Sequence, residues 1–212
     1  MIDTDDIRIT ALENIHIFNP AEVTGRFDIP VIHGVHDVPE LKWTTFNYAR
    51  SMDGYHKDTG VMFYIHDYQF SAVWNQPQKY VPLFQRFGAV MAPDFSYYTD
   101  MPTALQIYNH YRRMWCAAYW QANGIKVVPC ICWSNENSFD WCFDGQPTES
   151  IVSVSTVGTQ RYAESMELFR NGYEKMIEVL RPSKVLVYGR ILDFMGDEAV
   201  GIGCFTDKFK KG

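Results

Sequence analysis

The chain has 212 residues, of which 47% are hydrophobic and 16% aromatic, and its net charge is −6. This length suits a single α/β domain over residues 1–212, with its core at about residues 29–190 and enough apolar side chains to fill it. The negative charge argues against a bulk polyanion binder, so any contact with nucleic acid needs a local patch. Arg112 and Arg113 are one candidate, although such a pair more often marks a solvated helix face.

No apolar run reaches the length of a membrane span, and the first six residues are acidic rather than signal-like. We therefore expect a cytoplasmic protein without membrane contact. The five cysteines are odd in number and have no secretory context, so reduced thiols are expected for all of them. Their spacing matches no common zinc pairing, and nucleotide-loop and metalloprotease motifs are absent, so we predict no cofactor and no metal.

Apolar runs that end at polar residues predict strands at residues 29–34, 60–66, 88–92, 125–131, 150–155 and 184–188. Helical periodicity predicts helices at residues 39–52, 75–87, 103–122 and 160–181. Pro129 suggests a bulge or a strand end within the fourth run. Residues 7–18 and 200–205 are candidates for edge strands.

Strands that alternate with helices predict parallel βαβ units. About six core strands are too few for a closed eight-stranded barrel, which typically needs ~250 residues. We therefore predict an α/β fold whose parallel sheet is an incomplete, (β/α) barrel-like arrangement with the helices outside. An open doubly wound sheet is the alternative.

Acidic residues follow three of the predicted strands. Asp67 and Asp94 come just after consecutive apolar runs, and Glu136 lies in the polar loop after the fourth. Because parallel strands direct their carboxyl ends to one edge, two acids there can share a pocket and divide the roles of acid and base. We predict these three residues as catalytic, while an Asp at a strand end can also simply cap a helix.

Other side chains at the same edge are suited to binding a substrate. Aromatic rings can stack on a base, small hydroxyl residues and Gly expose hydrogen-bonding groups, and Arg suits phosphate or carboxylate. Thr156 can equally be a helix cap. The predicted binding residues are Gln69, Tyr97, Trp133, Asn135, Ser155, Thr156, Gly158 and Arg190.

Several segments resemble a domain-of-unknown-function family common in phages, prophages and other mobile elements. The resemblance rests on residues 64–70, 93–96, 106–109 and 154–158 and covers about residues 29–190. A weaker resemblance, in the order of strand-end acids, is to tRNA-guanine transglycosylases and their phage relatives. It implies that Asp67, Asp94 and residues 154–158 surround a base, although the zinc-binding cysteines of that superfamily are not evident and this chain is shorter.

The leading interpretation is a phage or mobile-element enzyme that acts on a nucleoside, a nucleotide or a nucleic-acid base. Paired carboxylates suit glycosidic-bond chemistry, in which one protonates the leaving group and the other stabilises the reacting centre. One alternative is a non-catalytic binder of a host protein or small signal molecule. Another is a metal-dependent hydrolase that uses Asp67, Asp94 and Glu136 as oxygen ligands. The sequence does not indicate an oligomeric state.

Overall fold

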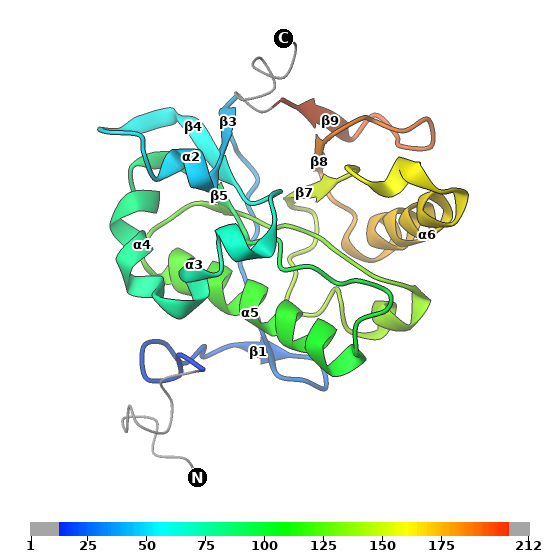
Figure 1. The fold of residues 1–212 in the computed structure, drawn as a ribbon, viewed down its shortest axis with the longest axis horizontal. Helices are drawn as coiled ribbons and strands as arrows, with labels where there is room; N and C mark the ends of the chain where they lie inside the picture. The colour runs from blue at the N-terminus through cyan, green and yellow to red at the C-terminus, as the bar shows by residue number, and fades with distance from the viewer. Residues whose placement is uncertain (1–12, 204–212) are drawn as a thin grey trace.

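The computed structural model describes residues 13–203, and its parallel strands form two sheets (Figure 1). One sheet holds, in order, β3 (Lys42–Thr45), β4 (His56–Met62), β5 (Phe87–Met91) and β6 (Val127–Val128). The other holds β7 (Ile151–Ser155), β8 (Lys184–Tyr188) and β9 (Ala199–Ile202). Neighbouring strands are parallel throughout both sheets, which confirms the predicted α/β class with parallel strands.

The two sheets are joined where β6 approaches β7. An isolated parallel bridge links Cys130 to Ser153. The Ser153 amide donates to the carbonyl of Pro129 at 2.8 Å, and the Ile131 amide donates to the carbonyl of Ser153 at 2.9 Å. Pro129 has no amide N–H, and β6 ends just before it, as the sequence predicts.

At the opposite edges, β3 and β9 are not paired with each other within residues 13–203. A groove of about 470 Å³ lies between these edges, with Trp43 and Ile202 among its lining residues. The described strands therefore do not close into a barrel, and the expected single sheet of about six strands is instead one sheet of four and one of three.

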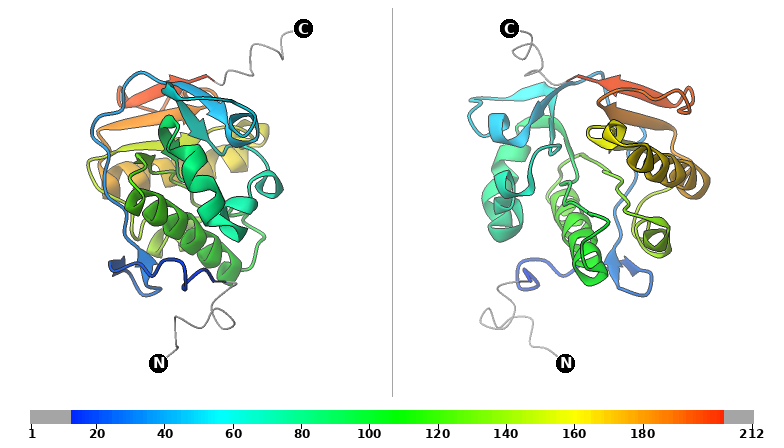
Figure 2. Two further views of the ribbon diagram at one scale, coloured as in Figure 1. Left: turned by 90° about the vertical axis from the view of Figure 1, so that its left-hand side faces the viewer. Right: turned by 45° about the vertical axis from the view of Figure 1, so that its right-hand side comes forward.

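Helices cover one face of each sheet. The first sheet packs on α4 (Pro77–Phe84) and α5 (Thr103–Ala122), and the second packs on α6 (Ala163–Leu180). Figures 1 and 2 show α4 and α6 on opposite sides of the molecule, with α5 between them. The short elements are α2 (Phe46–Ala49), α3 (Ala72–Asn75) and the 3-10 turns η1 (Asp67–Gln69), η2 (Glu136–Asp140) and η3 (Thr159–Arg161).

Successive strand residues alternate between two cores, because side chains of a strand point to opposite faces. Val61 and Phe63 pack toward the helices of the first sheet, and Val152 and Val154 pack toward α6. A third buried cluster draws on strands of both sheets. Its buried members are Trp43, Met62, Ala89, Met91, Val128, Ile151 and Leu186.

Two sequence predictions about the N-terminal half are wrong, and a third is tested only in part. Residues 29–34 give only β2 (Ile29–Pro30), which pairs antiparallel with β1 (Val23–Thr24), since a proline cannot donate to a central ladder. Residues 39–52 contain β3 before the single turn of α2. Trp43 lies across Gly60 of β4, where an added Cβ would come within 2.5 Å of the ring, so cross-strand packing overrides helical propensity. Within residues 13–18 no strand forms, while residues 7–12 lie outside the described chain.

Candidate functional site

A cavity of about 420 Å³ lies at the carboxyl ends of the strands. It draws residues from both sheets and from α6. Tyr64 follows β4, Asp94 follows β5, Trp133 follows β6 and Ser155 ends β7, while Phe169 comes from α6. The parallel arrangement thus gathers these side chains at one edge, which is where α/β folds bind their ligands.

Asp94 is the one carboxylate among the described residues that line the cavity. Its side chain is 25% exposed, and Oδ1 accepts a hydrogen bond at 3.0 Å from Nη2 of Arg113, whose side chain is 0% exposed. Burial raises the pKa of Asp94, the charge of Arg113 lowers it, and the nearby charge of Asp67 raises it again. Cys130 also donates to Oδ1, at 3.6 Å. Both of these contacts use Oδ1, which leaves Oδ2 for a ligand.

Asp67 is not among the residues that line the cavity. Its two carboxylate oxygens accept hydrogen bonds from Ser96, at 3.0 Å from the backbone N–H and at 2.7 Å from Oγ. Ser96 itself lines the cavity. The structure therefore brings both predicted acids to one site, but Asp67 holds the loop after β5 instead of facing the ligand space.

Replacing Asp67 by Asn should lower the free energy of unfolding by about 1–3 kcal/mol. An amide keeps one acceptor oxygen and turns an NH2 group toward the second Ser96 donor, so one charge-assisted hydrogen bond is lost. Urea unfolding measures the change, and Ser96→Ala completes a double-mutant cycle. Asp100→Asn, at an exposed acid of the same loop, is the control. A loss no larger than that of the control would contradict this role.

A polar stripe on α5 holds the whole loop between β5 and α5. Gln106 donates to the carbonyls of Tyr98 and Met101, and Asn109 donates to the carbonyl of Ser96. Arg113 donates to the carbonyls of Pro93 and Phe95 as well as to Asp94. All three are buried, with His110 on the same stripe. The sequence analysis favours a solvent-exposed helix face for Arg113, and this prediction is wrong because the Arg113 side chain is fully buried.

Tyr97 lines the cavity and is fixed from behind. Its hydroxyl lies 2.8 Å from Nδ1 of His110, and Nε2 of His110 lies 2.9 Å from the carbonyl of Asp144. Burial and the charge of Arg113 lower the pKa of His110 to about 3, so the ring is neutral. Because a carbonyl only accepts, Nε2 carries the proton and Nδ1 accepts from the tyrosine. The Arg113 guanidinium also lies over the Tyr97 ring, 4.6 Å from its centroid.

Trp133 forms another wall of the cavity and packs against α6. Its Nε1 donates to the carbonyl of Leu168 at 3.3 Å, and its ring lies 5.2 Å from that of Phe169. A Cβ added at Gly172 would lie 2.0 Å from Trp133 Nε1. Only glycine lets α6 approach this ring so closely.

At the junction of the sheets, Tyr64 and Tyr188 stack with an interplanar angle of 3° and centroids 5.3 Å apart. The Tyr64 hydroxyl lies 3.6 Å from Sγ of Cys130 and can donate to it, since the single thiol proton of Cys130 is directed to Asp94. On the β7 side, Gly158 has a φ of 88°, a left-handed conformation that favours glycine, and it lines the cavity.

Not every predicted site residue reaches the cavity. Asp94, Tyr97, Trp133, Ser155 and Gly158 line it. The other predicted site residues do not line it. Gln69 donates to the hydroxyl of Tyr68, Asn135 caps η2, and Thr156 is buried and donates to the Arg190 carbonyl. Glu136, on η2, and Arg190 are exposed. The catalytic prediction for Glu136 thus has no support from the geometry, because η2 carries it away from the cavity.

The cysteines of the described chain are free thiols, namely Cys116, Cys130, Cys132 and Cys142, while Cys204 lies outside the described residues. Cys132 lines the cavity, and burial raises its pKa to about 11. Within residues 13–203 no three His, Cys, Asp or Glu side chains are placed to hold a metal ion together, Asp67, Asp94 and Glu136 included. No helix in this part of the chain is long and apolar enough to cross a membrane.

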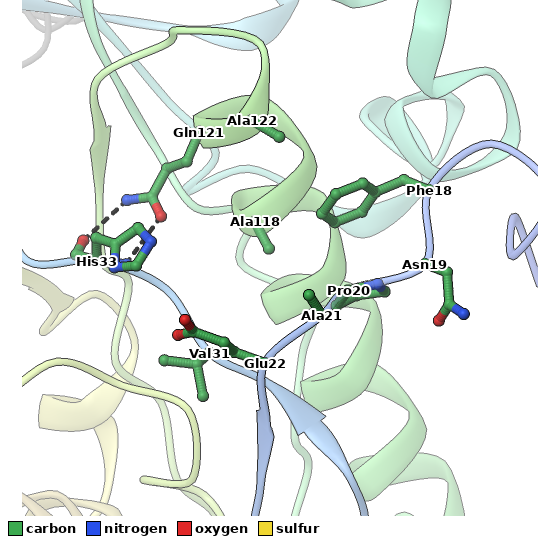
Figure 3. Close-up of a pocket in the computed structure, with 10 residues that line it drawn as sticks. All are labelled: Phe18, Asn19, Pro20, Ala21, Glu22, Val31, His33, Ala118, Gln121 and Ala122. Atoms are coloured by element: carbon green, nitrogen blue, oxygen red, sulfur yellow. Dashed lines mark hydrogen bonds between the residues drawn. The ribbon is translucent and has the colours of Figure 1, made fainter.

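A separate cavity of about 300 Å³ lies between the N-terminal loop and the end of α5 (Figure 3). The Gln121 side chain spans its edge, accepting from the His33 amide at 2.9 Å and donating to the His33 carbonyl at 2.8 Å. None of the predicted site residues lines this cavity. The strand-end cavity is therefore the candidate functional site.

Residues 21–205 match the model of a family described as Domain of unknown function (DUF4417). The chain is 36% identical over 182 residues to the Gene 1 protein of Mycobacterium phage L5, covering 79% of this chain and 80% of that protein. It is 35% identical over 182 residues to the Gene 1 protein of Mycobacterium phage D29, covering 79% and 67%. No solved structure matches the chain. These names state no activity, and the resemblance to tRNA-guanine transglycosylases stays a prediction.

Proposed function

The chain belongs to the DUF4417 family, whose function is unknown and whose members include phage proteins, and from the geometry of the strand-end cavity we propose that it binds a nucleoside or nucleobase and acts on the glycosidic bond. The observation that carries this proposal is Asp94. Its carboxylate lines the cavity with Oδ2 free of hydrogen bonds within the described chain, and the aromatic residues Tyr97 and Trp133 line the same cavity. Such a group can pair with the N–H edge of a base while a ring stacks on its face.

The chemistry proposed for Asp94 follows from its surroundings. Burial and the charge of Asp67 both raise its pKa, so protonation is easier than for an exposed aspartate. A carboxyl group tuned in this way can protonate a leaving base while a water molecule attacks the anomeric carbon of the sugar, and the proton that this water loses restores the carboxyl group, so the products are free base and free sugar. Asp67 takes no direct part, since both of its oxygens are engaged by Ser96.

The proposal includes an incomplete (β/α) barrel as the architecture behind the site. Three features support it: the parallel pairing in both sheets, the bridge between Cys130 and Ser153, and the third buried cluster, which draws on strands of both sheets. A barrel-like arrangement places the exits of β4, β5, β6 and β7 around one mouth.

Asp94→Asn should reduce base release by at least about a hundredfold, the lower end of what one general acid contributes. The measurement is chromatographic detection of free base from the four common ribonucleosides, their deoxy forms and a short single-stranded oligonucleotide. Glu136→Gln, which alters an exposed carboxylate off the cavity, is the matched control and should keep the wild-type rate. Release at the wild-type rate by Asp94→Asn would contradict a catalytic role.

A second function, binding without turnover, is favoured by one contact. The ion pair with Arg113 favours the charged form of Asp94, which suits recognition of N–H donors better than donation of a proton. Calorimetry separates the two functions. Heat of binding without base release, lost in Asp94→Asn, assigns the cavity to a binder.

A further inference from the structure

The described lining of the cavity holds a single carboxyl group, and the ion pair of this group with Arg113 favours its charged form. Among the described residues that line it, Asp94 is the only Asp, Glu, Lys, Arg or His. The nearby thiol and two of the phenols are neutral, because burial raises the pKa of Cys132 to about 11 and those of Tyr64 and Tyr97 well above their usual value. A ligand in this space therefore meets one negative charge and no positive one.

Arg113 does not supply the missing cation. Its side chain is 0% exposed and lies behind Asp94 and the Tyr97 ring. Nε donates to Pro93, and Nη2 donates to Asp94 and Phe95. Nη1 has no hydrogen-bond partner within the described chain, yet it is buried too, and the guanidinium borders the Cys132 thiol, whose pKa it lowers. Its charge compensates Asp94 and is closed off from a phosphate.

The neutral groups of the cavity suit the rest of a nucleoside. The hydroxyl-bearing residues Ser96, Ser155, Thr159 and Ser165 also line the cavity, and the Ser96 and Thr159 hydroxyls, which donate to Asp67 and to the Thr156 carbonyl, can still accept. Hydroxyls donate and accept, so they match the hydroxyls of a sugar. A phosphate dianion would instead be placed beside a partly desolvated carboxylate, where like charges repel more strongly than in water.

We propose that the cavity selects an unphosphorylated nucleoside or free base with N–H donors and rejects its 5′-phosphate. This inference rests on the proposed function and narrows it, because a nucleotide, or a nucleic acid whose phosphates must enter the cavity, is excluded as a ligand. The source of the selection is the Asp94 charge, acting without a Lys, Arg or His in the described lining.

The experiment is calorimetric titration of the full-length protein with adenosine, guanosine, cytidine and uridine and with the 5′-monophosphate of each. For whichever base binds, the nucleoside should bind at least about tenfold more tightly than its monophosphate, a difference of about 1.4 kcal/mol. High ionic strength should narrow this gap, because salt screens the repulsion. Asp94→Asn should close most of it, while Glu136→Gln should leave it unchanged.

The outcomes separate this inference from the proposed function. Monophosphates that bind as tightly as nucleosides overturn the selection against phosphate but leave base binding intact. A gap that persists in Asp94→Asn overturns Asp94 as its source. Absence of binding by every nucleoside and monophosphate overturns both proposals. If circular dichroism shows that Asp94→Asn does not fold, the salt dependence of the affinity difference between nucleoside and monophosphate in the wild-type protein tests the selection by itself.

Discussion

Arg113→Met should lower the free energy of unfolding by about 3–5 kcal/mol at neutral pH, the range for removing one partner of a buried ion pair. The substitution leaves Asp94 without its cation and the carbonyls of Pro93 and Phe95 without their donor. Methionine fills much of the volume, so the loss reports the charge and hydrogen bonds more than a cavity. Urea unfolding gives the value. Arg112→Met is the control, since Arg112 is half-buried and contacts the Phe95 ring, and it should cost about 1 kcal/mol or less.

The stability lost in Arg113→Met should also depend on pH, and the direction of this dependence identifies Asp94 as the partner of Arg113. The pKa of Asp94 in the folded protein lies above the ordinary value of 3.8, so the native state binds more protons than the unfolded state at pH values between the two pKa values. The contribution of Asp94 to stability therefore falls as the pH rises from the unfolded to the folded pKa. The positive charge of Arg113 lowers the pKa of Asp94. Without Arg113 this folded-state pKa rises, and the pH range over which stability is lost extends to higher pH. The deficit of Arg113→Met should therefore be larger at neutral than at mildly acidic pH. Adding Asp94→Asn should recover part of the stability, and no recovery would contradict the pairing.

Gly172→Ala should destabilise the protein by about 1–3 kcal/mol, the usual cost of overpacking a core. The sign is diagnostic, because the same change inside an ordinary helix stabilises by roughly 0.8–1 kcal/mol. Here the new methyl group would meet the Trp133 indole, with Nε1 at 2.0 Å. Either α6 moves outward or the ring moves into the cavity, so affinity for any ligand of the cavity should fall as well.

Thermal and urea unfolding measure the effect of Gly172→Ala, with Gly203→Ala as the control. A Cβ added at Gly203 would meet no atom of the described chain within 4 Å, and the φ of Gly203 is not positive, so its substitution should be nearly neutral. Trp133→Phe in the Gly172→Ala background makes room for the methyl group. The two changes should therefore couple favourably in a double-mutant cycle. Equal stability of Gly172→Ala and wild type would contradict this prediction, because it would show that the Trp133 indole moves aside at no energetic cost.

The sequence predicts the C-terminal elements well because their apolar patterns are long and their ends are marked. Residues 150–155 and 184–188 match β7 and β8 almost residue for residue, and residues 103–122 match α5. It fails at β3, where the strand is held by Trp43 packing on Gly60, a contact far from any local signal. The order of helix and strand in the N-terminal half therefore depends on tertiary packing.

For the site, strand-end position is a good guide and residue type is a poor one. Asp94, Tyr97 and Trp133 line the cavity as predicted, whereas Glu136 follows a strand but turns outward on η2. Arg113, considered only for a surface patch, is among the residues missed as part of the site. Its signal was present in the sequence, because Gln106, Asn109, His110 and Arg113 recur at helical spacing on an otherwise apolar helix. A polar stripe of that kind must find partners when it is buried.

The junction of the two sheets has a consequence for how the protein folds. Residues 42–128 complete one sheet and residues 151–202 complete the other, each from strands that follow one another in the chain. Neither sheet takes a strand from the other segment. The cavity, in contrast, takes Tyr64 and Asp94 from the first segment and Ser155 and Phe169 from the second. It exists only after the halves have docked, so a ligand binds the joined state alone and stabilises the last step of assembly by mass action.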